Sequence, residues 1–411
     1  MKFSEEQRKA IKDHRPFLFL QACAGSGKTR VIVERVKRHL MEGVLPEKIL
    51  CLTFTKKASI EMSERLLNQI KNVYTFHQFC LLQLKNHMDY NYEIIDPEEM
   101  EISPTELLKI STYKNSIYRT NKPNSFDKYQ DKLIKNNFKD FDDLLIDYLK
   151  SNIQNNYDYI LIDEFQDTNL LQYEVIKKMK KLDTHIFAVG DPNQSIYRFR
   201  GSNHLIIFQF IKEFEANILT LSINYRSSAN IVNTANQLVI HNPKKDYLEM
   251  IPHHQFDENV ESYAFMNRED ENLFIVNYCQ SVIEKNKYKS IAVIYRNHER
   301  AYHLKQFIYN LDHYQLKVNE TIQFLTIHQS KGLEFDLVIL IGLEQGVLPS
   351  LRDNQMIELE EERRLCFVGM TRAKKKLILT HVQYDDSSTI YTPSVFLSES
   401  HVKTHHFIPI K

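Results

Sequence analysis

The most constraining feature of the sequence is the segment ACAGSGKTR, residues 22–30, because it separates two segments of opposite pattern. The apolar run FLFL at residues 17–20 precedes it, and the amphipathic segment VIVERVKRHL at residues 31–40 follows it. A short apolar run is typical of a buried strand, and the second segment has helical spacing. A glycine-containing turn between such a strand and helix binds phosphate, since backbone amides and the helix N-terminus face the anion. The pattern predicts an α/β fold with a nucleotide site.

Individual residues of this segment have distinct expected roles. Gly25 and Gly27 allow the backbone to approach the phosphates. Lys28 is expected to reach the β and γ phosphates, and the Thr29 hydroxyl to bind Mg²⁺. Ala22 stands where the strict pattern has glycine, but the residues that contact phosphate are the later ones. We assign the phosphate-binding loop to Ala24, Gly25, Ser26, Gly27, Lys28 and Thr29.

Two acidic residues follow a second apolar run. The segment YDYILIDEF, residues 157–165, predicts a buried strand with Asp163 and Glu164 at its carboxyl end. Ligands of parallel α/β sheets bind at that end. We expect Asp163 to hold Mg²⁺ through water and Glu164 to polarise the water that attacks the γ-phosphate. Together with the phosphate-binding loop, this pair predicts nucleotide hydrolysis.

Strand-like and helix-like segments alternate on both sides of an interruption. Further apolar runs, separated by amphipathic stretches, occur at residues 48–54, 184–190, 291–295 and 335–343. This alternation is typical of a parallel sheet with helices on both faces. Between about residues 81 and 150 apolar runs are missing, which predicts a small helical insertion. The predicted organisation is a first lobe at 1–80 and 151–222, the insertion at 81–150, and a second lobe at 223–411.

Composition excludes several classes of protein. The 53 basic and 53 acidic side chains balance, so any nucleic-acid contact must be local rather than that of a global polycation. The five cysteines contain no CxxC pair, which favours a reducing cytosol over a disulfide framework or a zinc cluster. No apolar run approaches the ~18 residues of a membrane span. We therefore expect a cytoplasmic protein without a membrane partner.

One stretch carries a local excess of positive charge. Residues 109–140 contain eight basic and three acidic side chains. Two interpretations fit this composition equally well: a solvated helical surface, or a patch that faces DNA phosphates.

Motifs beyond the nucleotide site resemble those of one known family. DEFQDTN at residues 163–169 and VGDPNQSIYRFRG at residues 189–201 are similar to segments of the UvrD/Rep/PcrA helicases. Other similar segments, in chain order, are FSEEQRKAI, TFTKKASIEM, YTFHQF, FDDLL, LSINYRSSANI, FLTIHQSKGLEFDLVILIGLEQGVLP and EERRLCFVGMTRAKKKLILT. They extend from Gln7 to Thr380 in the order of that family. The resemblance to these superfamily 1A helicases implies two RecA-like lobes of the P-loop NTPase class.

The resemblance also implies how the nucleoside part of ATP is bound. Gln7 would read the edge of the adenine ring. Arg30 and Tyr225 would sandwich that ring, although a surface arginine and a core tyrosine are the simpler interpretation of the two side chains. Glu334 would bind the ribose hydroxyls, with Gly332 beside it in the same motif.

Further residues would act on the γ-phosphate. The resemblance implies that Gln194 senses this phosphate and positions water. Arg226 and Arg372 would contact it as arginine fingers, a class of contact that contributes ~10³–10⁵ in rate. With Lys28 and Glu164, these residues form the expected catalytic set.

A path for single-stranded DNA is implied as well. Aromatic side chains stack on any base, which contributes ~1–3 kcal/mol per base without sequence preference. Phe199 stands where relatives usually have Trp, and Phe54, which follows an apolar run, has an alternative interpretation as a core residue. The implied DNA contacts are Phe54, Thr55, His77, Tyr197, Phe199 and Arg200 in the first lobe and Thr326, His328 and Lys331 in the second.

The largest departure from the family lies in the second lobe. IAVIYRN at residues 291–297 is followed at residue 324 by FLTIHQSKGLEF, where UvrD and Rep have a large helical insertion. The resemblance implies an ATP- and Mg²⁺-dependent enzyme that moves 3′→5′ on single-stranded DNA or 3′-tailed duplex. Without the second insertion, we expect translocation by the isolated monomer without efficient unwinding.

Two other functions are compatible with part of this pattern. Compact relatives in bacterial defence systems such as Gabija suggest a DNA-stimulated ATPase subunit that senses DNA ends and regulates a partner, a nuclease or nuclease-ATPase. That alternative requires the same ATP-site residues, so the motifs do not separate the two. An RNA helicase is disfavoured because DEFQDTN and GMTRA resemble the DNA-directed branch.

Overall fold

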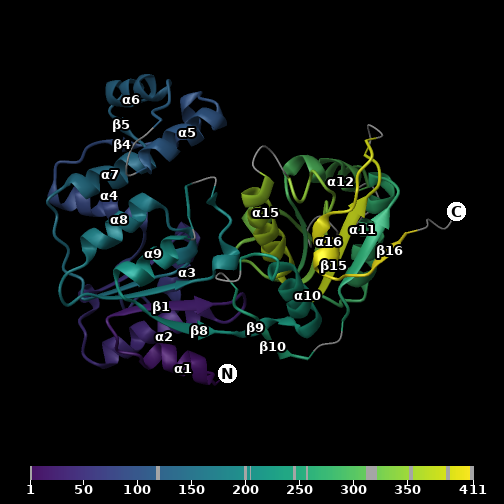
Figure 1. Cartoon of the computed structure of the whole chain (residues 1–411), viewed down its shortest axis with the longest axis horizontal. Helices are drawn as coiled ribbons and strands as arrows, with labels where there is room; N and C mark the ends of the chain where they lie inside the picture. Colours follow the sequence, from purple (N-terminus) through teal and green to yellow (C-terminus); the bar gives the residue numbers. More distant parts are fainter. Residues whose placement is uncertain are drawn as a thin grey trace. The chain divides into compact units, whose positions relative to one another are not determined.

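The chain folds into two compact units, which are described separately (Figure 1). The computed structural model describes residues 2–116, 121–198, 201–203, 205–243, 247–255, 258–311, 322–350, 355–385 and 389–407. The first unit comprises Met1–Ala22 and Gly27–Leu221, and the second comprises Cys23–Ser26 and Ser222–Lys411. Among the described residues, no helix has the length and apolar character needed to cross a membrane.

A six-stranded parallel sheet forms the centre of the first unit. Its strands, in spatial order, are β3 (Val73–Thr75), β2 (Ile49–Thr53), β6 (Tyr159–Ile162), β7 (His185–Gly190), β1 (Phe17–Ala22) and β8 (Asn217–Leu221). The strands β6, β7 and β1 are consecutive neighbours. Their carboxyl ends therefore bring the acidic pair, the segment after Gly190 and the phosphate-binding loop to one edge of the sheet.

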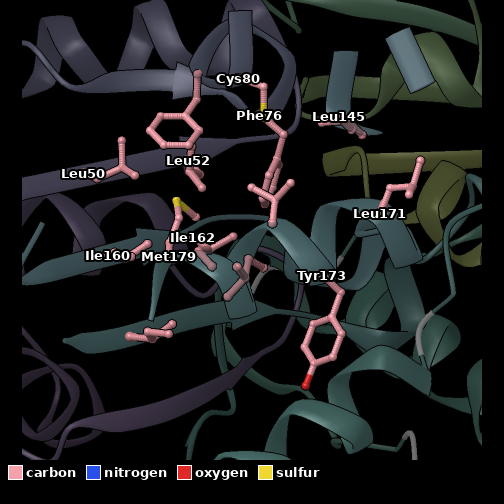
Figure 2. Packing of buried hydrophobic residues seen from close by; sticks show 14 of the residues in the cluster. Leu50, Leu52, Phe76, Cys80, Leu145, Ile160, Ile162, Leu171, Tyr173 and Met179 are labelled. Carbon is pink, nitrogen blue, oxygen red and sulfur yellow. The ribbon is translucent and has the colours of Figure 1, made fainter. Parts of the chain in front are cut away.

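Helices cover both faces of this sheet, because successive side chains along each strand point to opposite faces and both sets are buried. Leu18 and Leu20 of β1 pack into one apolar cluster, while Phe19 between them packs into the other. The Leu18 side is covered by α1 (Glu5–Lys12), α2 (Lys28–Met41) and α3 (Lys56–Arg65). The Phe19 side is covered by α4 (Phe76–His87), α7 (Phe141–Lys150), α8 (Leu170–Met179) and α9 (Leu205–Glu213). Figure 2 shows part of this second cluster, where Leu50, Leu52, Ile160 and Ile162 meet helical residues.

The predicted insertion has a small hydrophobic core of its own, formed by Ile95, Met100, Ile110, Tyr129 and Leu133. Its elements are β4 (Glu93–Ile94), η2 (Pro97–Met100), α5 (Pro104–Lys114), α6 (Phe126–Lys135) and β5 (Phe138–Lys139). In Figure 1, α5 and α6 lie beyond α4 and α7, away from the sheet. The two flanking helices α4 and α7 contribute to the core of the sheet. The residues of the separate core lie between these two helices in the sequence. The domain boundaries at 80/81 and 150/151 remain a prediction.

Five of the seven described basic side chains at residues 109–140 make contacts within the same region, and Arg119 lies outside the described residues. Lys114 is buried, and its Nζ lies 2.6 Å from Asp140 Oδ2 and 2.7 Å from Asp143 Oδ1. Lys132 donates to the Met100 carbonyl oxygen at 3.1 Å. Exposed or half-buried ion pairs join Lys109 to Glu106, Lys122 to Asp127 and Lys139 to Asp147. These contacts favour the interpretation as a structured, solvated surface over a dedicated DNA-binding patch.

The second unit contains another six-stranded parallel sheet. Its order is β13 (Ile322–Thr326), β12 (Ile291–Tyr295), β14 (Phe335–Ile341), β15 (Ala373–Val382), β11 (Glu261–Phe265) and β16 (Thr404–His406). The helices of the unit are α10 (Ala229–Val239), α11 (Arg268–Glu284), α12 (His298–Leu311), α14 (Ile327–Ser330), α15 (Gln355–Met370) and α16 (Val395–Glu399). A parallel pair, β9 (Ile223–Ser228) and β10 (Ile251–His254), lies outside this sheet. The predicted fold, two RecA-like α/β lobes with a helical insertion in the first, is confirmed.

Candidate functional site

The phosphate-binding loop has the backbone geometry that the sequence predicts. Gly27 is the N-cap of α2 and has a left-handed conformation with φ 84°, so Lys28 and Thr29 form the first turn of that helix. A Cβ at position 27 would lie 3.2 Å from Gln7 Nε2. Glycine is therefore favoured here by its φ angle, and a larger residue would also crowd the Gln7 amide.

Gln7 has a structural contact in addition to its expected role at adenine. It is the third residue of α1, where its Oε1 accepts a hydrogen bond from Ser4 N (3.1 Å) and Ser4 Oγ accepts one from Gln7 N (3.2 Å). This capping box fixes Oε1, which turns the amide nitrogen towards position 27. Arg30 Cζ lies 4.1 Å from the centroid of the Phe3 ring, so an aromatic neighbour already orients its guanidinium.

Thr29 and Asp163 are brought together as the predicted metal ligands. Thr29 Oγ1 lies 3.2 Å from Asp163 Oδ2, although 133 residues separate them in the chain. Burial and the neighbouring Glu164 raise the pKa of Asp163 to about 7, against the opposing effect of Lys28. A hydroxyl and a buried carboxylate are ligands that Mg²⁺ accepts, and a bound cation would favour the ionised carboxylate. The residues therefore fit the expected Mg²⁺ site.

Glu164 has an unusual backbone conformation. Its φ and ψ are 51° and 43°, in the left-handed region, and its backbone N donates to Asp163 Oδ1 at 2.9 Å. Lys28 Nζ lies 4.0 Å from Glu164 Oε2. The Glu164 side chain is 24 % exposed, so water can reach it. The expected general base and the expected phosphate-binding lysine are thus neighbours.

Gln194 is held by a residue that sequence reasoning missed. It ends the short helix η4 (Pro192–Gln194), which follows β7, and its Nε2 donates to Asp191 Oδ2 at 2.5 Å. Asp191 also accepts from Asn193 N at 3.1 Å, and burial raises its pKa. The signal in the sequence was an acidic residue directly after the apolar run of β7.

The first half of the phosphate-binding loop contacts β9 within the second unit. Asn224 Nδ2 donates to the Ala24 carbonyl oxygen at 2.8 Å, and Tyr225 N donates to the Gly25 carbonyl oxygen at 2.9 Å. Gly25 has φ 67°, and a Cβ there would lie 2.7 Å from Arg226 Cβ. Asn224, which sequence reasoning did not single out, therefore positions the loop from within the NYRSS motif.

Arg226 and Glu334, expected at the γ-phosphate and the ribose, contact each other. Arg226 Nε lies 2.8 Å from Glu334 Oε2, and Arg226 Nη1 donates to the Thr371 carbonyl oxygen at 3.1 Å. Burial opposes ionisation of Glu334, but Arg226 lowers its pKa below the usual value. Arg372 is buried and donates through Nε to the Val368 carbonyl oxygen at 2.9 Å. Gly332, at φ 83°, lies two residues before Glu334 in the chain.

The Tyr225 ring is supported by β10. Its centroid lies 4.7 Å from that of His253, and His254 Nε2 is 2.8 Å from the Tyr225 carbonyl oxygen. His253 is exposed and His254 is half-buried. Whether Tyr225 contacts adenine remains a prediction, but its ring and its backbone are both fixed by the neighbouring strand.

Two of the predicted DNA contacts stack on each other. The ring centroids of Phe54 and Tyr197 are 4.9 Å apart with an interplanar angle of 26°. Both side chains are half-buried rather than enclosed, so the core interpretation of Phe54 is not favoured. Thr55 is exposed and caps α3, where its Oγ1 accepts from Ala58 N at 3.2 Å. Phe199 and Arg200 lie outside the described residues.

The other predicted DNA contacts occupy equivalent places in the two units. The sequence Thr-x-His-Gln begins at the last residue of β3 and at the last residue of β13, which are edge strands adjacent to β2 and β12. Each threonine forms a capping box with its glutamine, so Thr326 has a structural role, and His77 and His328 are the second residues of their helices. Burial lowers the pKa of His77 to about 4. Lys331 follows α14 and is half-buried.

The raised pKa of Asp163 predicts that Mg²⁺ binding depends on pH. Because Mg²⁺ requires the ionised carboxylate, its apparent affinity should fall about tenfold per pH unit below pH 7 and level off above it. Titration calorimetry of Mg²⁺·ADP in buffers of different ionisation enthalpy measures the protons released. Asp163→Asn is the control that removes the contribution of this group and leaves that of the nucleotide. Equal proton release by the two proteins near pH 7 would contradict the prediction.

Comparison with known proteins agrees with these observations. The UvrD/REP helicase N-terminal domain matches residues 3–100 and 89–215, and the UvrD-like helicase C-terminal domain matches residues 219–312 and 307–384. A probable DNA helicase of Mycoplasma pneumoniae is 29 % identical over 98 % of this chain and 88 % of its own length. The ATP-dependent DNA helicase PcrA of Staphylococcus aureus is 30 % identical over 72 % of this chain and 48 % of its own, and that of Staphylococcus epidermidis is equally similar.

The chain thus spans about half the length of the PcrA relatives that it matches. Both family domains are matched in order, and together they cover most of the sequence. The chain therefore belongs to the UvrD/Rep family of ATP-hydrolysing DNA helicases.

Proposed function

We propose that this protein uses ATP hydrolysis to move 3′→5′ along single-stranded DNA in the cytoplasm. The observation that carries the proposal is the position of the Phe54–Tyr197 stack. Tyr197 lies three residues after Gln194, the expected γ-phosphate sensor, and Phe54 follows β2, the neighbour of the strand that ends just before Asp163. Residues expected to contact DNA and residues expected to contact ATP therefore share the segment 194–197 or follow neighbouring strands of one sheet.

The hydrolysis step follows from the residues at the edge of the first sheet. Glu164 accepts a proton from the water that attacks the γ-phosphorus, and the bond from this phosphorus to the bridging oxygen breaks to leave ADP and phosphate. Lys28 stabilises negative charge on the β and γ phosphates, and Gln194 orients the water. Mg²⁺, held at Thr29 and Asp163, would neutralise charge on the phosphate oxygens.

The proposed DNA contact depends on stacking rather than on base recognition. The faces of the Phe54 and Tyr197 rings accept any base, as a motor requires. His77 and His328 offer imidazole groups at matching helix starts. Because the pKa of His77 is lowered to about 4, its contact with DNA would be that of a neutral ring over the physiological range.

Phosphate release with and without an oligonucleotide tests this proposal. ATP hydrolysis should be strongly stimulated by single-stranded DNA, and equal rates would contradict the coupling. Direction is tested by displacement of streptavidin from biotinylated oligonucleotides. Movement 3′→5′ predicts faster displacement from the 5′ end than from the 3′ end, and the reverse preference would contradict the proposed polarity.

Removal of the aromatic stack should weaken DNA binding. Phe54→Ala is expected to lower the affinity for single-stranded DNA by ~1–3 kcal/mol, equally for oligo-dT and oligo-dA, because stacking is tolerant of base identity. Fluorescence anisotropy at several salt concentrations measures the effect. Phe17→Ala, which removes another paired ring of the same unit, controls for loss of packing alone. An unchanged DNA affinity of Phe54→Ala would assign this ring to folding instead.

The alternative function is a DNA-responsive ATPase subunit that regulates a partner nuclease. The observation that favours it is the short connection between β12 and β13: residues 296–321 separate the two strands, and the described part of this connection, residues 296–311, contains α12. A monomer with so little added surface should translocate without efficient unwinding. Single-turnover unwinding of a 3′-tailed duplex at limiting enzyme decides this point. Full-length displacement by monomers would argue for an autonomous helicase, and displacement only with a partner protein for the alternative.

A further inference from the structure

Gln166 connects the two segments of the first unit that carry hydrolysis and DNA contact. It lies in the short helix η3 (Phe165–Asp167) and is fully buried. Its Oε1 accepts a hydrogen bond from Asp191 N at 3.0 Å, and its Nε2 donates to Glu164 Oε2. Its backbone oxygen accepts from Ser195 Oγ at 3.1 Å. One residue thus contacts the expected general base and both ends of the segment 191–195.

The orientation of the Gln166 amide is determined by its partners. A backbone N–H only donates, so the atom that faces Asp191 N must be the carbonyl oxygen. The amide nitrogen is then directed to the Glu164 carboxylate, which accepts. Lys28 Nζ approaches the same oxygen, Oε2, at 4.0 Å. These two contacts to one oxygen restrict rotation of the Glu164 carboxylate, the group expected to accept the proton.

Gly190 shows how closely the two segments approach each other. A Cβ at this position would lie 2.7 Å from Gln166 Oε1 and 3.2 Å from Gln166 N. Gly190 is not among the described residues with positive φ, so its backbone conformation alone does not require glycine. Glycine is required here because Gln166 approaches position 190 so closely. The contact between η3 and the end of β7 is therefore sterically restricted as well as hydrogen bonded.

The connection continues to the aromatic stack. Asp191 accepts from Gln194 Nε2 at 2.5 Å, and Ser195, which contacts Gln166, is two residues before Tyr197. Tyr197 stacks on Phe54. A displacement of Tyr197 by a bound base would thus act on the backbone contacts of Gln166, and through its amide on Glu164.

We infer that Gln166 is a positioning residue that couples the occupancy of the Phe54–Tyr197 stack to the orientation of the Glu164 carboxylate. The inference rests on the proposed function, because it requires that DNA binds at this stack and that Glu164 is the general base. It identifies Gln166 as the residue that transmits base binding at the stack to the Glu164 carboxylate. Gln166 itself does not contact the reacting atoms in this role.

Gln166→Leu tests the coupling, because leucine fills similar space without hydrogen bonds. The ratio of DNA-stimulated to basal kcat should fall about tenfold to hundredfold, the range for loss of a hydrogen bond to a charged group, with unchanged KM for ATP and unchanged DNA affinity. Gln172→Leu is the matched control. Gln172 is a buried glutamine that caps α8, so its loss should lower Tm without changing the stimulation ratio.

Two further variants separate positioning from folding. Gln166→Glu places a second carboxylate beside Glu164 while Asp163, Asp191 and Lys28 stay unchanged, so the acid limb of the kcat–pH profile should move to higher pH. An unmoved acid limb would show that position 166 does not face the Glu164 carboxylate, and would overturn the positioning role. Gly190→Ala should reduce the stimulation ratio as Gln166→Leu does, and should add little in a Gln166→Ala background, where the closest contact is gone.

The outcomes distinguish this inference from the proposed function. If DNA does not stimulate the wild-type protein, the proposed function fails. If wild type is stimulated and Gln166→Leu is stimulated equally, the coupling role fails while the proposed function stands. An equal loss of basal and stimulated kcat in Gln166→Leu would also overturn the coupling role, because it would show that Gln166 supports hydrolysis without responding to DNA.

Discussion

Replacement of Arg226 by alanine is expected to lower the kcat of ATP hydrolysis by ~10³–10⁵-fold, the range measured for arginine fingers. The guanidinium would stabilise the charge that develops on the γ-phosphate only in the transition state. Because the ground state lacks this charge, the KM for ATP should change little. Rapid-quench measurement of single-turnover hydrolysis checks this separately from product release. Arg226→Lys should recover only part of the rate, because an ammonium group lacks the fork geometry of the guanidinium.

The structure supplies a control for this variant. Arg226 forms an ion pair with Glu334 at 2.8 Å, so alanine also removes that contact. If the ion pair were the only role of Arg226, Glu334→Gln would lower kcat as strongly. We expect instead that Glu334→Gln raises the KM for ATP through the ribose and leaves kcat within about threefold of wild type, a difference of less than ~1 kcal/mol in barrier. Retention of a tenth of the wild-type rate by Arg226→Ala would contradict the finger role.

Glu164→Gln should lower kcat by ~10²–10⁴-fold and leave ATP binding intact, because the amide keeps the shape of the side chain but accepts no proton. The neighbours of the carboxylate should keep the glutamine in place, since Lys28 and Gln166 both approach Oε2 and an amide oxygen can occupy that position. Stopped-flow phosphate release measures turnover, and a fluorescent ATP analogue measures binding.

Glu34→Gln is a suitable control, because Glu34 is a partly exposed residue of α2 that pairs with Lys37 at 3.1 Å. It should hydrolyse ATP at the wild-type rate. If Glu164→Gln retained substantial turnover, the water would be activated by another group, and Asp163 would become the residue to test.

Much of the fold could be predicted because its central strands are apolar and its loops carry recognisable chemistry. The runs before Cys23 and Asp163 became β1 and β6, and the run around Ala188 became β7. These strands are buried on both faces, so their hydrophobic signal is continuous. The short edge strands β3, β8 and β16 were not predicted. In β8, for example, exposed and buried residues are mixed in a five-residue segment, which weakens any pattern.

The site residues could be predicted where they lie in one continuous motif. Contacts between segments that are distant in the sequence could not be predicted. The phosphate-binding loop and the acidic pair are each continuous in sequence. The contacts of Asn224 with Ala24, and of Gln166 with Asp191, join residues that are 200 and 25 positions apart. No local pattern indicates such pairs. The contact between Gln166 and Asp191 depends on the adjacency of β6 and β7 and on the close approach at Gly190, and that between Asn224 and Ala24 depends on the approach of β9 to the phosphate-binding loop.

The backbone conformation of Glu164 has a consequence for the engineering of this enzyme. A non-glycine residue at φ 51° costs about 1–2 kcal/mol, which glycine avoids. Glu164→Gly should therefore be more thermostable than Glu164→Ala by about 1 kcal/mol in the free energy of unfolding, as chemical denaturation would show, and equal stabilities would argue against strain at this position. Both variants are expected to be inactive. Selection of variants for heat resistance alone would thus favour loss of the expected general base, so any such screen of this protein has to score ATP turnover as well.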